Sequence, residues 1–460
     1  MNFVAQVKEY GKERPKCFCR YFVGTEMHAL QQASTAQDRL SQGFWASLIV
    51  SFLIISIVMT KNTYGDFLDN QILTTFSIKQ VGELEFPSVI MCPKNADALH
   101  IHLVYRDIRK RMKNMTEGEM DKLIGYAMAD AGFVNMDEFV KNMTDDQHKE
   151  KTKLLNQWKG RRTPDKFYRD LFQKFGYKCE EMFKECKLGA EKVPCCQLFK
   201  EHYVMLRGRC FRLVKLFQAD PDYHGRLYLS MKQGPSPILS HDKMQPQVVA
   251  YIAPPTSDVS TFPRYYLNYQ SYNYLSASAK NLRLRPDVSS CFPSDERRGK
   301  NACYVRRWLY ERFITPMNCT PFYMNYRAPW ASVCEVGKIA KIYFDIIDVS
   351  MNGTKCLPAC TRTDRYFIIY TKEHTTWDVS KNVPDFTLEF GYTDLEYEQY
   401  EEVLTTTLPG FVSQIGGQLN LFLGVTILSV IQFGLSSTIF IFKKWKGVKH
   451  INLHSHLKKR

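Results

Sequence analysis

The sequence has few long apolar segments, and this scarcity excludes a transporter built mainly from membrane-spanning helices. The mean hydropathy is -0.32, so most of the chain must form a water-soluble domain. Only residues 43–60 and residues 411–442 are both free of charge and long enough to cross a bilayer. A charge at the bilayer centre costs ~2.5–3.5 kcal/mol on insertion scales, so both segments predict transmembrane helices. Two buried core helices are the alternative, although helices in soluble cores are usually shorter.

Other absences narrow the functional classes. The sequence shows no nucleophile motif, no phosphate-binding loop and no metal-binding helix. No enzyme activity, cofactor or metal site is therefore expected. The stretch before the second apolar segment, residues 391–410, has no Lys or Arg, and the last residues, 443–460, have no acid.

This charge distribution predicts the orientation in the membrane. Residues 1–42 contain six Lys or Arg and residues 443–460 contain seven, so the positive-inside rule places both in the cytoplasm. No cleavable signal peptide is expected, because 42 mostly polar residues precede the first apolar segment. Much of the net charge of +15 lies in these tails, which suits contact with membrane lipid rather than nucleic acid. The predicted domains are a cytoplasmic N-terminal region (1–42), a first transmembrane helix (43–60), an extracellular domain (61–410), a second transmembrane helix (411–442) and a basic cytoplasmic tail (443–460).

The cysteines and glycosylation sequons agree with this topology. Twelve of the 14 cysteines lie in the predicted extracellular domain, and an even number in an oxidising compartment predicts six disulfides. Cys17 and Cys19 lie in the predicted cytoplasmic region and should stay reduced. All the Asn-x-Ser/Thr sequons also fall between the two apolar segments, at Asn114, Asn142, Asn352 and, more weakly because Cys fills its middle position, Asn318.

The predicted extracellular domain mixes strands and helices. Alternating apolar residues indicate strands, and apolar residues three or four apart indicate helices. Strands are expected over residues 74–92, 339–349, 365–371 and 384–392, a helical insertion over 97–175, strands and loops over 204–280, and a helix over 303–319. The fold class is therefore a membrane protein with two transmembrane helices flanking a large, mixed α/β, disulfide-rich extracellular domain.

The second apolar segment is too long for a simple membrane span. As a helix its 32 residues would extend ~48 Å, against a hydrocarbon core of ~30 Å, so it must be tilted or interrupted. An interruption at Gly424, Val425 and Thr426 could present carbonyls and a hydroxyl to an ion. A continuous packing helix, with Gly416 and Gly417 allowing close contacts, is the alternative.

Three motifs resemble the epithelial sodium channel, degenerin and acid-sensing ion channel family. The segment IGGQLNLFLGVTIL at residues 415–428 resembles the family's second membrane helix. FPSVIMC at residues 86–92 is similar to the motif soon after the first helix, and CLPACTRTDRY at residues 356–366 is similar to a motif late in the extracellular domain. The resemblance extends in order from about His28 to about Leu435, which is nearly the whole chain.

The resemblance implies a trimeric sodium channel of the plasma membrane that amiloride blocks, with palm, finger and thumb regions in each subunit. It implies a selectivity filter at Gly424, Val425 and Thr426. The implied pore-mouth and gating residues are Ser413, Gln414, Gly416, Gly417, His28 and Tyr64.

The sequence departs from the family pattern at several of these positions. The family's N-terminal His-Gly pair appears as His28-Ala29, and an ordinary exposed imidazole is the alternative interpretation of His28. Val425 is bulkier than the usual small residue, and Thr426 replaces the usual Ser. Acids of many members are replaced by Gln414, Gln432 and Leu435. Selectivity must then come from carbonyls and hydroxyls.

Five acids before the second apolar segment partly compensate for the uncharged pore: Asp394, Glu396, Glu398, Glu401 and Glu402. In a trimer they would bring fifteen negative charges to the outer mouth, which would concentrate cations and attract divalent blockers. A solvated charged face is the alternative.

The resemblance also implies disulfide pairs, namely Cys92–Cys210, Cys291–Cys360, Cys303–Cys356 and Cys319–Cys334. The other extracellular cysteines should pair among themselves, with Cys186 joined to Cys195 or Cys196 and Cys179 taking the remaining one. A zinc site is the competing interpretation of the adjacent Cys195 and Cys196, but adjacent cysteines outside the cell are usually oxidised.

Together these features favour a subunit of a homo- or heterotrimeric, ligand- or stimulus-gated, amiloride-sensitive cation channel. A weakly conducting regulatory subunit is the first alternative, motivated by His28-Ala29, Val425 and the uncharged pore. A non-conducting cell-surface receptor is the second, but an anchor needs only ~20 residues, so the overlong second segment disfavours it.

Overall fold

The computed structural model describes residues 38–69, 72–221, 223–253, 258–293, 299–350, 356–373, 384–431, 434, 435, 437, 438, 441 and 442. The chain forms two compact units. One contains Met1–Leu73 and Val403–Arg460, and the other contains Thr74–Glu402.

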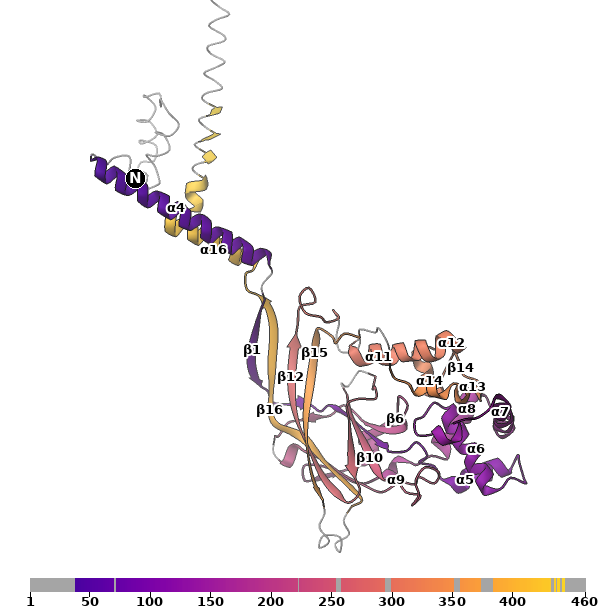
Figure 1. Ribbon diagram of the computed structural model, residues 1–460. Helices are drawn as coiled ribbons and strands as arrows, with labels where there is room; N and C mark the ends of the chain where they lie inside the picture. Colours follow the sequence, from indigo (N-terminus) through magenta and orange to yellow (C-terminus); the bar gives the residue numbers. More distant parts are fainter. Residues whose placement is uncertain are drawn as a thin grey trace, which may run out of the picture. The chain divides into compact units, whose positions relative to one another are not determined.

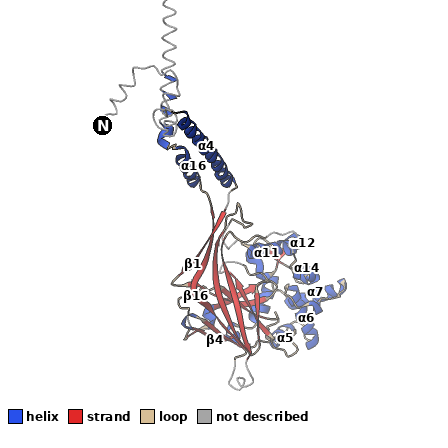
Figure 2. Ribbon diagram, turned by 60° about the vertical axis from the view of Figure 1, so that its left-hand side comes forward, coloured by secondary structure: helices blue, strands red, loops and turns tan. Residues whose placement is uncertain are grey.

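The first unit contains two long helices that lie side by side, α4 (Arg39–Leu68) and α16 (Leu408–Leu423) (Figures 1 and 2). They run antiparallel, because Phe67 contacts Phe411 whereas Phe52 contacts Phe422. Among the described residues, α4 is the helix that is long and apolar enough to cross a membrane. α16 has 16 residues, fewer than the ~20 a span needs, so the second transmembrane helix stays a prediction.

The second unit is built on a seven-stranded sheet in the order β15-β12-β16-β9-β4-β5, with β1 also paired to β16. β12 and β16 are parallel, whereas β12–β15, β16–β9 and β4–β9 are antiparallel. The strands are β1 (Ile72–Gln80), β4 (Phe183–Leu188), β5 (Glu191–Val193), β9 (Leu227–Met231), β12 (Ser271–Arg283), β15 (Thr361–Glu373) and β16 (Phe386–Leu404). Three of the predicted strand segments, 74–92, 365–371 and 384–392, thus contain strands.

A five-stranded sheet in the order β11-β10-β3-β7-β6 adjoins it. Its strands are β3 (Ser88–Pro93), β6 (Phe199–Val204), β7 (Gly208–Leu213), β10 (Gln247–Ala253) and β11 (Arg264–Asn268). Two short pairs complete the sheets: β2 (Leu84–Glu85) with β8 (Phe217–Gln218), and β13 (Cys319–Thr320) with β14 (Ser332–Val333).

The predicted helical insertion is confirmed, and local capping explains where its helices begin. Thr116 and Thr144 each form a capping box with the residue three positions later, which satisfies backbone N–H groups that a helix start leaves open. Thr163 caps the next helix, which begins at Pro164. The helices are α5 (Ile101–Arg109), α6 (Glu117–Asp130), α7 (Asp145–Lys159) and α8 (Pro164–Arg169), with short turns at η1 (Asp137–Phe139) and η2 (Asp170–Lys174).

A second helical group packs against this insertion (Figure 1). It contains α11 (Lys300–Leu309), α12 (Thr315–Met317), α13 (Lys338–Lys341), α14 (Tyr343–Ile347), η5 (Tyr310–Ile314) and η6 (Phe322–Arg327). Trp158 of α7 and Trp308 of α11 are both completely buried in the shared apolar core. The remaining short helices are α9 (Cys179–Met182), α10 (Cys195–Leu198) and η3 (Tyr223–Gly225).

The strand predicted over residues 339–349 is wrong, because this segment forms α13 and α14. Its buried side chains, Ile339, Tyr343 and Ile346, are spaced four and three residues apart, which is a helical repeat. Asp130 also accepts hydrogen bonds from the first N–H groups of α13. The packing face and this cap favour the helix over the predicted strand.

The described residues form six disulfides, and four of them are the pairs expected from the resemblance: Cys92–Cys210, Cys291–Cys360, Cys303–Cys356 and Cys319–Cys334. The other two are Cys179–Cys196 and Cys186–Cys195. The adjacent Cys195 and Cys196 therefore each form a disulfide, and the zinc interpretation of this pair is wrong.

Candidate functional site

The second apolar segment is broken at Gly424. α16 ends at Leu423, and Gly424 adopts a left-handed conformation with φ of 66°. The N–H of Gly424 donates to the carbonyl of Asn420 at 2.9 Å, and the N–H of Val425 donates to the carbonyl of Leu419 at 3.3 Å. The bond from Gly424 to Asn420 is that of the αL C-cap motif, which ends helices at glycine because only glycine enters the left-handed region freely.

The chain becomes helical again directly after the break, over residues 427–431. Thr426 caps this second half: its hydroxyl accepts from the N–H of Ser429 at 3.1 Å, while its own N–H donates to the Ser429 hydroxyl at 3.2 Å. The arrangement is reciprocal, as in a capping box. The hydroxyl that the sequence assigns to the filter therefore also holds the helix start.

The break places two helix ends next to each other in the chain. The end of α16 leaves carbonyl groups without helical partners, and a helix C-terminus carries partial negative charge. The open carbonyl oxygens favour a cation, whereas the helix start at Ile427, next along the chain, carries partial positive charge. The predicted filter residues Gly424, Val425 and Thr426 are consecutive in this break.

A polar contact joins the two helices before the break, at Gln418 of α16. The side chain of Gln418 donates to the hydroxyl of Thr63 at 2.9 Å and accepts from the hydroxyl of Thr60 at 3.5 Å. Thr63 is buried, as is Ser56, which lies about two turns away on α4. The sequence interpretation missed this contact, although a glutamine inside a charge-free apolar segment was a signal for it.

The predicted pore-mouth residues lie in the first ten residues of α16 and near the end of α4. Ser413, Gln414, Gly416 and Gly417 are exposed on α16. A Cβ added at Gly416 or Gly417 would meet nothing within 4 Å, so these glycines do not serve close packing within the chain. Tyr64 is 52% exposed, and its ring lies 6.3 Å from that of Phe411. His28 lies outside the described residues.

The five predicted vestibule acids lie on β16, and the chain itself engages three of them. Glu398 forms a 2.9 Å ion pair with Lys280, which, with a hydrogen bond from Tyr400, holds the pKa of its carboxyl below the usual range. Glu402 accepts from the Arg285 N–H at 2.7 Å and from Ser289. Glu401 accepts from Gln399 at 3.1 Å. Asp394 is exposed and Glu396 is half-buried.

Three predicted glycosylation sites, Asn114, Asn142 and Asn318, are exposed. Asn142 and Asn318 have positive φ, a backbone region that asparagine tolerates. Asn352 lies outside the described residues.

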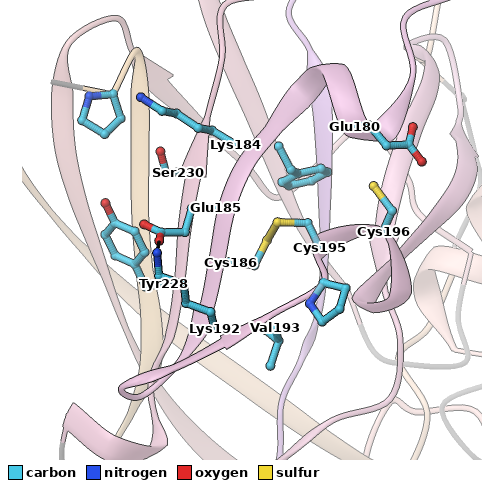
Figure 3. Close-up of a pocket in the computed structure, with 13 residues that line it drawn as sticks. Glu180, Lys184, Glu185, Cys186, Lys192, Val193, Cys195, Cys196, Tyr228 and Ser230 are labelled. Atoms are coloured by element: carbon cyan, nitrogen blue, oxygen red, sulfur yellow. Dashed lines mark ion pairs between the residues drawn. A yellow bond between two sulfur atoms is a disulfide. The ribbon is translucent and has the colours of Figure 1, made fainter. Parts of the chain in front are cut away.

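A cavity of about 680 Å³ adjoins the Cys186–Cys195 disulfide and was not predicted (Figure 3). Glu185 and Lys192 form a 2.7 Å ion pair inside it. Because Lys184 and Glu180 also line it, the ionised groups of both signs balance, and the cavity has no preference for one sign of charge.

A second cavity, of about 380 Å³, contains a perturbed histidine. It is lined by Glu201, His202, Tyr203, Arg212, Asp258, Tyr323, Tyr326 and Arg327. Burial, and then the nearby Arg212 cation, lowers the pKa of His202 to about 4. His202 is therefore neutral near pH 7, while Asp258 pairs with Arg327.

The comparison with known protein families identifies the family of this chain. The sequence profile described as amiloride-sensitive sodium channel matches residues 21–435. The chain belongs to this amiloride-sensitive sodium channel family. It is accordingly an ion-channel family member with transmembrane segments, and its described residues contain six disulfides.

Two further comparisons add little to the family assignment. No individual curated protein matches the chain significantly. Among solved structures, the chain is similar to one described as a cryo-EM structure of a proton-activated chloride channel, at 7% identity and a TM-score of 0.32, over 87% of this chain and 98% of that one. This likeness carries no argument about the ion or the stimulus of the sodium channel family member.

Proposed function

We propose that this chain is a pore-forming subunit of a trimeric, stimulus-gated and amiloride-sensitive cation channel of the plasma membrane, and that it conducts sodium. The observation that carries the proposal is the break at Gly424, Val425 and Thr426, within a charge-free segment that the family profile covers. Irregular backbone at membrane depth is tolerated only where it is buried in protein or lines a wet cavity. Three copies of the break around an axis would line such a cavity with carbonyls.

The proposed topology has residues 61–410 outside the cell and both termini in the cytoplasm. Six disulfides between Cys92 and Cys360 support an oxidising compartment. Glycosidase treatment should lower the mass of the expressed protein through Asn114, Asn142 or Asn352, and tags at both termini should stay inaccessible in intact cells. A terminal tag that antibodies reach without permeabilisation contradicts this topology.

Exposed apolar surface supports assembly with further subunits. Tyr366, Ile368 and Tyr370 alternate along β15 and are each more than half exposed, so they form one apolar face of an edge strand. The open surface at Gly416 and Gly417 on α16 is a second candidate contact. Subunit counting on single channels at the cell surface should give three copies.

The decisive experiment measures current from this chain expressed alone. Inward current should appear under pH steps or peptide application, fall when sodium is replaced by a large organic cation, and be blocked by amiloride. Cells expressing Gly424→Leu at the same surface level serve as the matched control. Wild-type protein at the surface without any such current contradicts a pore-forming role.

A weakly conducting regulatory subunit is the second candidate function. One observation favours it: α16 and residues 424–431 carry no ionisable side chain, and the Thr426 hydroxyl is engaged as a helix cap. In that case the chain alone should give little current, and co-expression with a related subunit should change the selectivity or amplitude of that partner's current.

A further inference from the structure

An apolar groove runs between α4 and α16, and its lining includes Thr60 and Tyr64, which were described above in the Gln418 contact and in the predicted pore mouth. Its volume is about 440 Å³, and it is lined by Leu53, Ser56, Ile57, Thr60, Lys61, Tyr64, Ile415, Leu419 and Leu423. The α4 residues recur every three or four positions and the α16 residues every four, so both sets follow one helix face. The groove therefore extends over several turns of both helices.

The two ends of the groove differ chemically. At one end Lys61 and Tyr64, both exposed, bring an ammonium group and a phenol to the rim. Lys61 forms no ion pair with any residue in the described part of the chain. At the other end the lining is Leu53 and Leu423, and Leu423 is the last residue of α16 before the break at Gly424.

We propose that this groove binds one acyl chain of a phospholipid, with the lipid phosphate at Lys61. A cation and a phenol at one end of an apolar channel are the groups that meet a headgroup at the membrane interface. The groove is a single channel of about 440 Å³ along the two helices, so we place one acyl chain in it.

The Lys61 charge is the feature that would make a lipid prefer this groove to the surrounding bilayer. Apolar contact alone gives no preference inside a membrane, because lipid tails are as apolar as leucine. Attraction between Lys61 and a phosphate gives such a preference, because a basic residue near a lipid headgroup contributes to binding. A lipid bound in the groove would contact both α4 and α16 as far as Leu423. It would therefore influence the conformation of the break that begins at Gly424.

The binding test needs no current, so it can fail independently of the proposed channel function. Purified full-length chain in detergent is titrated with phosphatidylglycerol, and separately with diacylglycerol of the same acyl chains, and retained lipid is counted by native mass spectrometry. Phosphatidylglycerol should bind with higher affinity. Lys61→Gln should weaken its binding about fivefold, whereas Lys61→Arg should restore it. Equal affinity for both lipids, or no effect of Lys61→Gln, overturns the assignment of the phosphate to Lys61.

A second pair of variants tests the groove itself. Leu419→Trp fills the groove and should abolish lipid retention, whereas Val58→Trp adds the same bulk at an exposed position of α4 outside the lining and should not. If Leu419→Trp leaves lipid retention unchanged but alters the mass of the oligomer, the groove is a contact with another subunit and the inference is overturned.

Discussion

The carboxylate of Asp130 accepts a 2.6 Å hydrogen bond from the N–H of Gly337, which lies 207 residues later in the chain. The same carboxylate accepts from the N–H groups of Ile339 and Ala340 at 3.0 and 2.9 Å. One buried side chain therefore joins the end of α6 to the start of α13. Gly337 has φ of 86°, and a Cβ there would lie 2.2 Å from the Thr152 hydroxyl, so this close approach requires glycine.

Asp130→Ala should destabilise the protein strongly. It leaves three N–H groups near Gly337 without an acceptor, and each buried donor left open costs ~1–3 kcal/mol, so the free energy of unfolding should fall by about 3 kcal/mol or more. Denaturant unfolding of the full-length protein in detergent measures this. Asp146→Ala is the matched control: Asp146 is exposed and pairs only with Lys149, so the change should stay below about 0.5 kcal/mol. Similar losses in the two variants would contradict the role given to Asp130.

His202 should make stability depend on pH. Burial lowers the pKa of His202 from 6.5 to about 4, so between these values the unfolded chain binds a proton that the folded chain does not. The contribution of His202 to the free energy of unfolding is greatest above pH 6.5. It falls by up to roughly 3 kcal/mol as the pH drops through this window. His202→Gln should flatten the pH dependence of thermal unfolding, whereas His241→Gln, at an exposed site, should leave it unchanged. An unaltered pH profile in His202→Gln would refute the prediction.

Two substitutions at Gly424 should distinguish the effect of backbone strain from the effect of side-chain size in the proposed pore. Any L-residue at φ of 66° costs ~1–2 kcal/mol, although a Cβ there meets no atom within 4 Å. Gly424→Ala should therefore reach the surface in reduced amount but conduct normally per channel. Gly424→Leu carries the same strain and adds three large side chains around the proposed axis, so its current per surface channel should be lost. Equal current per channel in both variants would place the conduction path elsewhere.

Thr426 should affect both stability and selectivity, because its hydroxyl caps the helix that begins at Ile427. Thr426→Val removes the cap, at a cost of ~0.5–2 kcal/mol, and removes the hydroxyl from the proposed filter. Thr426→Ser keeps both groups and should behave like the wild type. Reversal potentials in sodium and potassium measure the permeability ratio, which should shift only in the Val variant. If Val channels at the surface keep the wild-type ratio, the hydroxyl acts as a cap alone.

Local chemistry explains which elements the sequence could predict. The helical insertion begins where Thr116 and Thr144 precede an acid or amide by three residues, and such a cap acts within one turn. The break at Gly424 is equally local, because the glycine conformation alone ends the helix. For the disulfides, the resemblance to a family gave four pairs and left the partners of Cys179 and Cys186 open.

Contacts between distant segments decided the rest. Nothing near Asp130 in the sequence distinguishes it from a surface acid, and only the fold brings α13 to it. The same holds for Glu398, which the sequence assigned to an open vestibule and which the fold pairs with Lys280. The sequence by itself determined the two apolar segments, the helix caps and the glycine break, since each depends on a few adjacent residues. The tertiary structure alone decided residues 339–349, the Gln418–Thr63 contact and the α4–α16 groove, because their energies come from partners hundreds of residues away.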